Sequence, residues 1–250
     1  MRFKLDHHNK ILKILESLNH KLLKESLAYF GGGTLIALNF EEYRRSKDVD
    51  FICPVSTSGY KRLRTAIYDG GYEALFDDLT QIKIGHSTTD QYGIRMLIMV
   101  DDLPIKAEII AEVRFELDPP RYLEWTSVPC LSLNDCFTSK LLANSDRYLD
   151  ISVEARDLID LSVLRLHSAI PDSAINKAES TYEVMRPLRD AVKNFQARPD
   201  FRDKYFNNLQ INSEQIPQII DGIDLLAKDL GLAHTERTFQ EKHDPYTFGF

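Results

Sequence analysis

FGGGT at residues 30–34, followed by DVDF at residues 48–51, is the part of the sequence that most restricts the fold. Glycine has no Cβ, so a glycine turn brings backbone close to a ligand, and a turn that enters a helix offers unpaired N–H groups to a phosphate. Thr34 is expected to cap that helix. The first stretch therefore predicts a phosphate-binding turn, whose register among Gly31, Gly32 and Gly33 stays open.

The second stretch predicts a strand over residues 48–53. Residues two apart in a strand share a face, so Asp48 and Asp50 project together while Val49 and Phe51 point into the core. At about 4 Å, two carboxylates repel by roughly 1 kcal/mol in water and by about 4 kcal/mol at an effective dielectric constant of about 20. Mg²⁺ would relieve that repulsion, because one or two carboxylates plus substrate phosphates are its usual ligands. A solvated, charge-rich turn is the alternative.

The rest of the chain divides into two parts by its patterns. The first part predicts helices at about residues 9–28, 34–40 and 58–69, then strands at residues 72–84, 94–100 and 105–114. After Pro119-Pro120 the periodicity is helical, with a kink expected at Pro187 and a loosely held tail at residues 241–250. We therefore predict an α/β domain over residues 1–125 and a helical domain over residues 126–250.

Composition narrows the class of protein. The net charge of −7 argues against a protein that coats nucleic acid non-specifically. The three cysteines lack metal-ligand spacing, and the histidines are scattered, so buried thiols and structural histidines are expected. The charged N-terminus is not typical of a signal peptide, and no apolar stretch is long enough to span a bilayer. These features predict a cytoplasmic protein with no membrane partner.

The combined pattern resembles the AbiEii/AbiGii-type nucleotidyltransferase toxin family. The resemblance rests on GGT at residues 32–34, RxSxDVDF at residues 44–51, Lys140 and RDLIDL at residues 156–161, and it covers roughly residues 28–165. It implies an α+β fold, with a mixed-sheet nucleotidyltransferase core followed by a helical C-terminal domain that completes the nucleotide site. It also implies Mg²⁺ as cofactor and a nucleoside triphosphate (NTP) as substrate.

Further site residues follow from the strand and helix patterns and from this resemblance. Glu108, on a neighbouring strand, is a third candidate carboxylate, as a metal ligand with Asp48 and Asp50 or as a proton acceptor; a pair with Lys106 or Arg114 is the alternative.

Lys140 lies in an apolar helix, where a lysine either reaches solvent or meets anions such as a triphosphate. By resemblance, Asp157 orients Lys140 or touches the nucleotide, and Asp160 holds its helix in place. Helix spacing also allows Asp160 to pair with Arg156, and an interhelical salt bridge for both aspartates is the alternative.

The expected function is Mg²⁺-dependent transfer of a nucleotidyl group from an NTP to an acceptor. Gly32, Gly33, Thr34, Ser46 and Lys140 are the expected nucleotide-binding residues. The toxin resemblance favours a tRNA 3′ end or a protein hydroxyl as acceptor and implies an antitoxin partner. A small-molecule acceptor of the aminoglycoside kind and a non-catalytic nucleotide-binding module remain alternatives.

Overall fold

The computed structural model describes residues 3–243, which form two compact units. The first unit runs to Glu42 and continues over Ser46–Cys136; the second contains Tyr43–Arg45 and the described residues from Phe137 onward. The division at Cys136 falls inside helix α5 (Leu133–Arg147). The assignment of functional domains to residues 1–125 and 126–250 stays a prediction.

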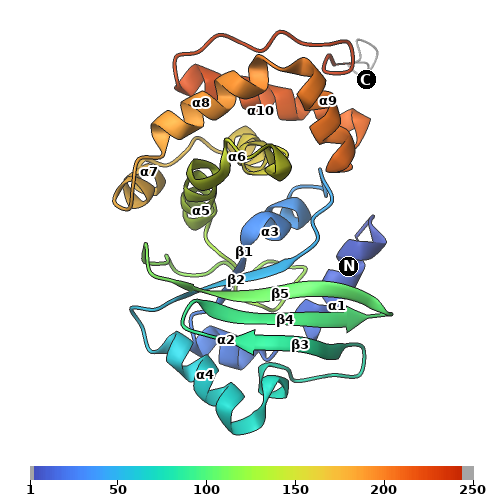
Figure 1. The fold of residues 1–250 in the computed structure, drawn as a ribbon, viewed down its shortest axis with the longest axis vertical. Helices are drawn as coiled ribbons and strands as arrows, with labels where there is room; N and C mark the ends of the chain where they lie inside the picture. Colours follow the sequence, from blue (N-terminus) through green and yellow to red (C-terminus); the bar gives the residue numbers. More distant parts are fainter. Residues whose placement is uncertain (1–2, 244–250) are drawn as a thin grey trace. The chain divides into compact units, whose positions relative to one another are not determined.

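The first unit is built on a five-stranded sheet in the order β1-β2-β5-β4-β3 (Figure 1). Only the β2–β5 pair is parallel and the other three pairs are antiparallel, so the sheet is mixed. The strands are β1 (Tyr29–Gly31), β2 (Val49–Pro54), β3 (Lys83–Thr89), β4 (Gly93–Val100) and β5 (Leu103–Glu112).

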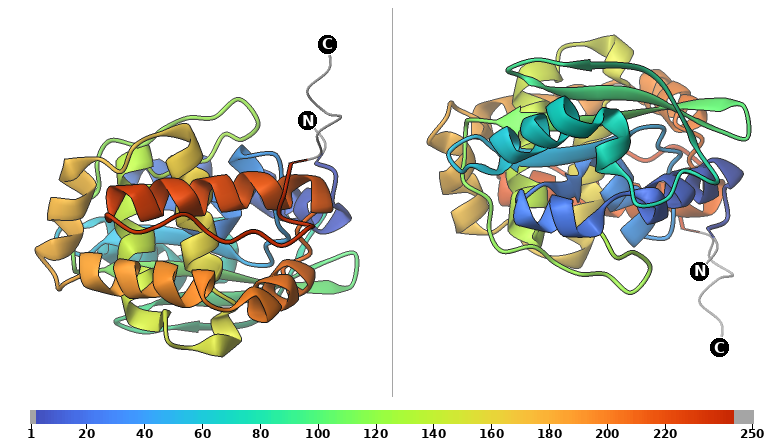
Figure 2. Two further views of the ribbon diagram at one scale, coloured as in Figure 1. Left: turned by 90° about the horizontal axis from the view of Figure 1, so that it is seen from above. Right: turned by 90° about the horizontal axis from the view of Figure 1, so that it is seen from below.

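The helices of the first unit pack against this sheet. Helix α1 contacts β4 and α4 contacts β2, and the view from below in Figure 2 shows α1, α2 and α4 on one side of the strands. Helix α3 begins directly after β1 and contacts β2. Before Phe137 the helices are α1 (Asp6–Ser17), α2 (His20–Glu25), α3 (Gly32–Asn39), α4 (Gly59–Gly70) and the start of α5.

The two faces of the sheet differ in polarity, as strand β5 illustrates. Ile105, Ala107 and Ile109 are buried, whereas Lys106 and Glu108 project from the opposite face and are partly or fully exposed. This alternation is the period-two pattern of a strand with one face on the core. The sheet therefore supplies a rigid apolar support for a polar face.

The second unit is helical. Apolar residues of α8 at three- and four-residue spacing, Leu188, Val192 and Phe195, are buried. Helix α8 packs on α6, α9 and α10, and the view from above in Figure 2 shows α8 and α10 side by side. Besides α5, its helices are α6 (Arg156–His167), α7 (Asp172–Glu179), α8 (Met185–Gln196), α9 (Pro199–Asn208) and α10 (Ile216–Asp229). The predicted α+β class with a helical C-terminal region is confirmed.

Several local predictions were wrong for identifiable reasons. The helix expected over residues 9–28 divides at Leu18, because Asn19 caps α2 by accepting from Leu22 N. The strand expected over residues 72–84 is instead a short 3-10 helix, Tyr72–Leu75, and the polar strand β3 further on. Pro187 does not kink a long helix; it lies in the first turn of α8, where proline is tolerated.

The prediction of a loosely held tail over residues 241–250 is wrong for Glu241, its first residue. Glu241 is fully buried, and its Oε1 lies 2.6 Å from Arg202 Nε. Residues 244–250 lie outside the described residues. The chain after α10 is therefore anchored to α9 as far as Glu241.

Two features are absent from residues 3–243, a disulfide bond and a helix able to cross a membrane. Cys53, Cys130 and Cys136 are buried thiols outside any disulfide, and burial raises the pKa of the Cys53 and Cys130 thiols to about 12. Within residues 3–243, no helix has both the length and the apolar character needed to cross a bilayer.

Candidate functional site

A row of residues in register crosses the polar face of the sheet. Gly31 pairs with Asp50 between β1 and β2, Asp50 with Glu108 between β2 and β5, and Glu108 with Arg95 between β5 and β4. Adjacent strands lie about 4.8 Å apart, so the carboxylates of Asp50 and Glu108 project side by side from one face. Asp48 precedes β2 by one residue, the spacing that keeps it on the face of Asp50. Asp48, Asp50 and Glu108 are thus gathered by the sheet.

Gly32 is the glycine of the run that the geometry requires. Its φ is +68°, in the left-handed region, and a Cβ built there would lie 2.5 Å from Asp50 Oδ2. At Gly31, a Cβ would instead meet the flexible side chain of Leu131. The start of α3 therefore lies against the Asp50 carboxylate because residue 32 has no side chain.

We expect Gly32→Ala to lower nucleotidyl-transfer activity by about 10-fold to 100-fold, because the new methyl group has to displace either the helix start or the Asp50 carboxylate. Steady-state kinetics of the variant against wild type measure the effect. Gly231→Ala is the matched control: Gly231 also has a positive φ, of +64°, but no atom lies within 4 Å of the position that a Cβ would take there. Equal activity losses in the two variants would contradict a specific role for Gly32.

Thr34 and Ser46 are buried and join α3 to the segment before β2. Thr34 Oγ1 donates to the Asp48 carbonyl oxygen at 2.5 Å and lies 2.7 Å from Ser46 Oγ, so Ser46 is the donor in that second contact. Helix α3 begins at Gly32, so Thr34 lies in its first turn and is not its N-cap. The observed contacts fix the backbone at Asp48, and the predicted contacts of Thr34 and Ser46 with phosphate stay predictions.

A buried histidine extends this network. His8 Nε2 accepts from Ser46 N at 3.0 Å, and His8 Nδ1 lies 2.7 Å from Glu42 Oε1. The first contact assigns the ring proton to Nδ1, which therefore donates to Glu42. Glu42 also accepts from Leu5 N at 3.0 Å. It is positioned by a turn in which Glu41 and Glu42 both have a positive φ, an uncommon conformation outside glycine.

His8 is therefore a positioning residue that the sequence did not single out. We expect His8→Ala to lower kcat of transfer by about 10-fold to 100-fold, because Ser46, Thr34 and the Asp48 backbone lose their anchor. The matched control is His20→Ala, since His20 also makes a backbone contact, with Leu15 O at 3.0 Å. Because a positioning role predicts partial retention by a variant that keeps an acceptor, His8→Gln should recover part of the rate. Failure of His8→Gln to exceed His8→Ala would argue for a packing role alone.

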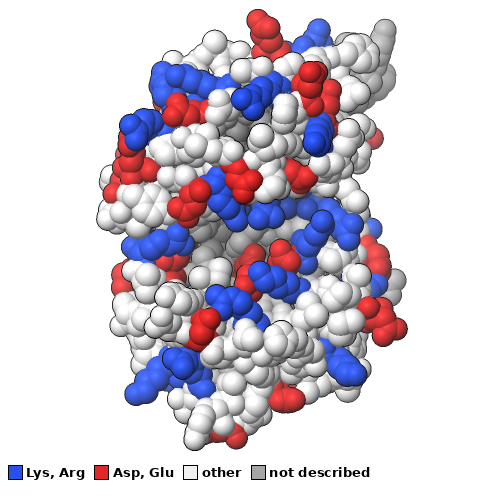
Figure 3. All heavy atoms as spheres, in the orientation of Figure 1, with Lys and Arg blue, Asp and Glu red and all other residues white. Residues whose placement is uncertain are grey.

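Of the three carboxylates, Asp48 and Asp50 fit Mg²⁺ better than Glu108, which already pairs with two cations. Glu108 Oε1 lies 3.2 Å from Arg95 Nε and Glu108 Oε2 lies 2.7 Å from Lys106 Nζ. Over the sheet, Figure 3 shows basic side chains next to acidic ones. Within residues 3–243, no three His, Cys, Asp or Glu side chains form a ready metal cluster. Asp48 and Asp50 fit Mg²⁺ all the same, because this ion is usually held by one or two carboxylates and by substrate phosphates rather than by a protein cage.

In the second unit, Lys140 and Asp160 form a buried charge cluster with Arg44. Lys140 Nζ lies 2.8 Å from Asp157 Oδ1 and 2.5 Å from Asp160 Oδ2. Arg44 Nε and Nη2 donate to the two Asp160 oxygens at 2.7 and 2.9 Å. Tyr43 Oη donates to Asp160 Oδ1 at 2.5 Å. Asp160 thus pairs with Arg44 and Lys140, in place of the Arg156 pair that the helix spacing allowed.

Burial and opposite charge compete within this cluster. Burial alone would raise the pKa of Asp160, but the charges of Arg44 and Lys140 outweigh it and hold that pKa well below its usual range. Burial would lower the pKa of Lys140, yet Asp157 and Asp160 raise it. The pKa of Asp157 is lowered in the same way, against burial, by Lys140 and Arg147. All these groups therefore stay charged at neutral pH.

The predicted site residues thus form two groups. Gly32, Gly33, Thr34, Ser46 and the three carboxylates belong to the first unit, and Lys140 and Asp157 belong to the second. The residues missed were His8, Glu42, Tyr43 and Arg147, with Arg44 noted only as part of a motif. His8, Glu42 and Tyr43 act through partners distant in sequence, which no local pattern marks, whereas Arg147 pairs with Asp157 ten residues away.

Comparison with known proteins follows this geometry. The profile described as nucleotidyl transferase AbiEii toxin, type IV TA (toxin–antitoxin) system, matches residues 13–243. Among curated proteins, none matches the sequence. Two Helicobacter pylori crystal structures, of a candidate nucleotidyltransferase and of JHP933, match with a TM-score of 0.52 and 19% identity. They cover 92% of this chain and 98% and 95% of theirs, respectively, and they support the fold.

The match to the family profile covers more than nine-tenths of the described residues, from the first helix to the last described residue. It includes the glycine turn, the Asp48 and Asp50 pair, Lys140 and Asp157. The resemblance inferred from the sequence is confirmed: the chain is a nucleotidyltransferase that belongs to the AbiEii toxin family.

Proposed function

We propose that this chain transfers a nucleotidyl group from an NTP to an acceptor hydroxyl, with Mg²⁺ held by Asp48 and Asp50. The observation that carries the proposal is the position of Asp50. Its carboxylate faces the side-chain-free start of α3 at Gly32 and lies in register with Glu108. A helix start with free N–H groups beside paired carboxylates suits a phosphate chain together with its metal.

We assign different roles to the site residues of the first unit. Gly32 and Gly33 would present backbone N–H groups to the phosphates, and Thr34 and Ser46 would contact them or fix the loop that does. Glu108 would bind the metal with Asp48 and Asp50 or accept the proton of the acceptor hydroxyl. When bound, Mg²⁺ would neutralise charge on the triphosphate and on the leaving pyrophosphate.

The reaction itself is an in-line displacement. The acceptor oxygen forms a bond to the α-phosphorus, the bond from that phosphorus to the bridging oxygen breaks, and pyrophosphate leaves. The hydroxyl proton passes to a carboxylate or to solvent. Positioning of the reactants and stabilisation of charge supply most of the rate in such reactions.

Lys140 and Asp157 are proposed to take part in nucleotide binding. An ammonium group has three N–H donors, and contacts with Asp157 and Asp160 occupy two of them. The third would donate to a phosphate oxygen. Asp157 would orient the ammonium group, a role consistent with its distance of 2.8 Å from Lys140 Nζ.

We propose a tRNA 3′ end as the acceptor to test first, with a protein hydroxyl second. The family description, a toxin of a type IV toxin–antitoxin system, supports an antitoxin protein as partner. We infer a macromolecular acceptor from the toxin class. The reaction would take place in the cytoplasm, where triphosphates and tRNA occur. The net charge of −7 favours a cationic small molecule as the competing acceptor class.

The test is transfer of label from each of the four α-labelled NTPs to total tRNA, with Mg²⁺ and with EDTA. Wild-type protein should label tRNA with Mg²⁺ only, and a folded Asp48→Ala variant should not. Label on protein, or on an added aminoglycoside, would change the acceptor class. Equal labelling of tRNA by wild type and by Asp48→Ala would contradict the proposal that Asp48 belongs to the active site.

A further inference from the structure

The second unit contains a pocket of about 230 Å³. Residues of α5, α6, α8 and α9 line it, together with the turn that joins α5 to α6. Pockets for drug-sized ligands usually occupy about 300–1,000 Å³. This smaller volume suits one planar ring system and its substituent.

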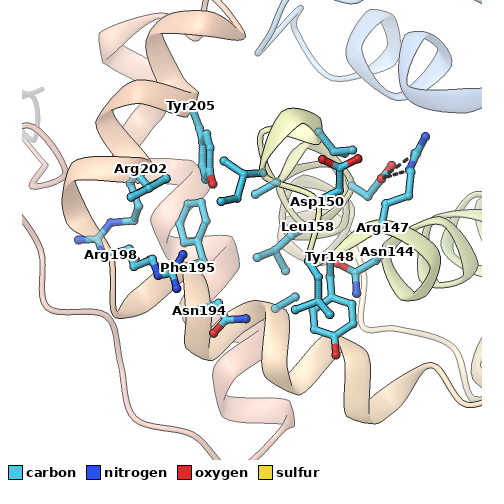
Figure 4. A pocket seen from close by; sticks show the side chains of 17 residues that line it. Asn144, Arg147, Tyr148, Asp150, Leu158, Asn194, Phe195, Arg198, Arg202 and Tyr205 are labelled. Atoms are coloured by element: carbon cyan, nitrogen blue, oxygen red, sulfur yellow. Dashed lines mark hydrogen bonds and ion pairs between the residues drawn. The ribbon is translucent and has the colours of Figure 1, made fainter.

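The pocket contains a buried donor without a partner. Asn144 is 2% exposed, and its Nδ2 has no hydrogen-bond partner among the described residues. In Figure 4 its side chain lies beside Tyr148 at the pocket wall. Buried N–H groups are nearly always paired, because leaving one unpaired is costly. A ligand with a hydrogen-bond acceptor would satisfy this group.

The rest of the lining is largely aromatic. Tyr148, Phe195, Phe201 and Tyr205 contribute to the wall, and Figure 4 shows the rings of Phe195 and Tyr205 close together. Every nucleobase has a flat face that stacks on such rings, as well as acceptor atoms at its edge. An aromatic side chain of a protein offers the flat face but, in phenylalanine and tryptophan, no strong acceptor for Asn144.

One cation of the lining is available for an anion. Arg147 is committed to Asp157, at 2.6 Å, and Arg202 to Glu241. The Arg198 guanidinium lies 5.5 Å from the centre of the Phe201 ring, and within residues 3–243 it forms no ion pair. The Asp150 carboxylate also lines the pocket, but it is bound by Ser152 N and Oγ.

The turn at the pocket has an unusual backbone. Glu154 and Ala155 have φ values of +57° and +50°, and Ala155 is part of the lining. Side chains other than glycine seldom adopt this conformation, and such residues concentrate at ligand sites.

We propose that this pocket binds one nucleotide. Its base would lie among the aromatic rings with an acceptor atom on Asn144 Nδ2, and its phosphate would meet Arg198. The nucleotide could be a free monophosphate or one unit of single-stranded RNA, since both offer the same base and phosphate. Asp157, proposed above to take part in NTP binding, also lines this pocket. The proposal concerns binding without Mg²⁺ and does not depend on the transfer reaction.

The experiment measures binding to the full chain in EDTA, at one fixed ionic strength. The first probes are AMP, CMP, GMP and UMP, whose binding is monitored by NMR line shapes. The second is a fluorescein-labelled single-stranded RNA hexamer, whose binding is monitored by fluorescence anisotropy. The variants are Asn144→Leu, which keeps volume and removes the donor, and Arg198→Gln. Arg186→Gln is the matched control, because Arg186 is an exposed arginine of α8 that pairs with Glu183 at 3.0 Å.

We expect at least one probe to bind wild type, with Kd raised about 10-fold by Arg198→Gln and unchanged by Arg186→Gln. Asn144→Leu should weaken binding of the same probe, with Arg198→Gln serving as the independent test if that buried variant does not fold. Binding of the hexamer and not of the monophosphates assigns the pocket to RNA, and the reverse assigns it to free nucleotide. No binding of any probe, or equal weakening by both arginine variants, would overturn the proposal whether or not the protein transfers nucleotides.

Discussion

Asp50→Asn is expected to lower kcat of nucleotidyl transfer by at least about 1,000-fold, the scale of losing a group that stabilises transition-state charge. Asparagine keeps the shape of the side chain beside Gly32 but removes the charge that, in the proposed function, would hold Mg²⁺ against the triphosphate. Glu108 is a poor substitute, because Arg95 and Lys106 already share its charge. Single-turnover rates with the acceptor found for wild type measure the effect.

The matched control is Asp101→Asn, the same chemical change in the same unit. Asp101 is exposed and pairs with Lys13 at 2.9 Å. Its φ is +48°, and asparagine tolerates this conformation. Activity should be unchanged in Asp101→Asn. A wild-type rate of transfer by a folded Asp50→Asn protein would contradict a role for Asp50 in the active site.

Asp160→Ala is expected to reduce the free energy of unfolding by about 3–5 kcal/mol, because it leaves Arg44 and Lys140 buried with too little negative charge. Both cations contact Asp160 directly, and all three side chains are nearly inaccessible to solvent. Urea unfolding of the full chain, followed by circular dichroism, measures the change.

Asp229→Ala is the control for the loss of an arginine-paired aspartate. Asp229 Oδ2 lies 2.6 Å from Arg165 Nε, at a partly exposed position. Such pairs contribute about 0–1 kcal/mol. If both variants lose the same stability, the buried cluster is no more important than a surface ion pair.

Acid should narrow the difference between wild type and Asp160→Ala. The folded-state pKa of Asp160 is lowered, since Arg44 and Lys140 outweigh burial. Its stabilising contribution is therefore complete above the unfolded pKa of about 3.9 and is lost as pH falls toward the lower folded value. Repeating the urea titrations between about pH 3 and pH 7 checks the sign, and a constant difference below about pH 4 would contradict it.

The sequence predicted best where periodicity is strong. Strands β4 and β5 follow from period-two apolar spacing, because each places alternate residues on the core. Strand β2 and helix α6 were also predicted from their apolar residues, although both are buried on nearly all sides. Strand β3 reads KIGHSTT and is largely exposed, so it lacks the alternation that marks a half-buried strand. The three-residue strand β1 is too short to show a period.

The candidate site was predictable in its residue types but not in its contacts. Strand alternation places Asp50 with Asp48, yet only the register of β2 on β5 brings Glu108 alongside. The choice of Gly32 depends on a backbone angle that three identical residues cannot reveal. His8 and Arg44 find their partners across 38 and 116 positions in sequence, and one sequence contains no signal for such pairs.

The segment Tyr43–Arg45 has a consequence for how the chain is made and divided. It belongs with the helical unit, although more than 90 residues of the first unit follow it before that unit is complete. During synthesis, Arg44 emerges 116 residues before Asp160, so its charge stays solvated until that later segment arrives. A cut at Cys136 would yield a C-terminal fragment that lacks this arginine. The helical unit therefore cannot be produced from one continuous piece of the chain.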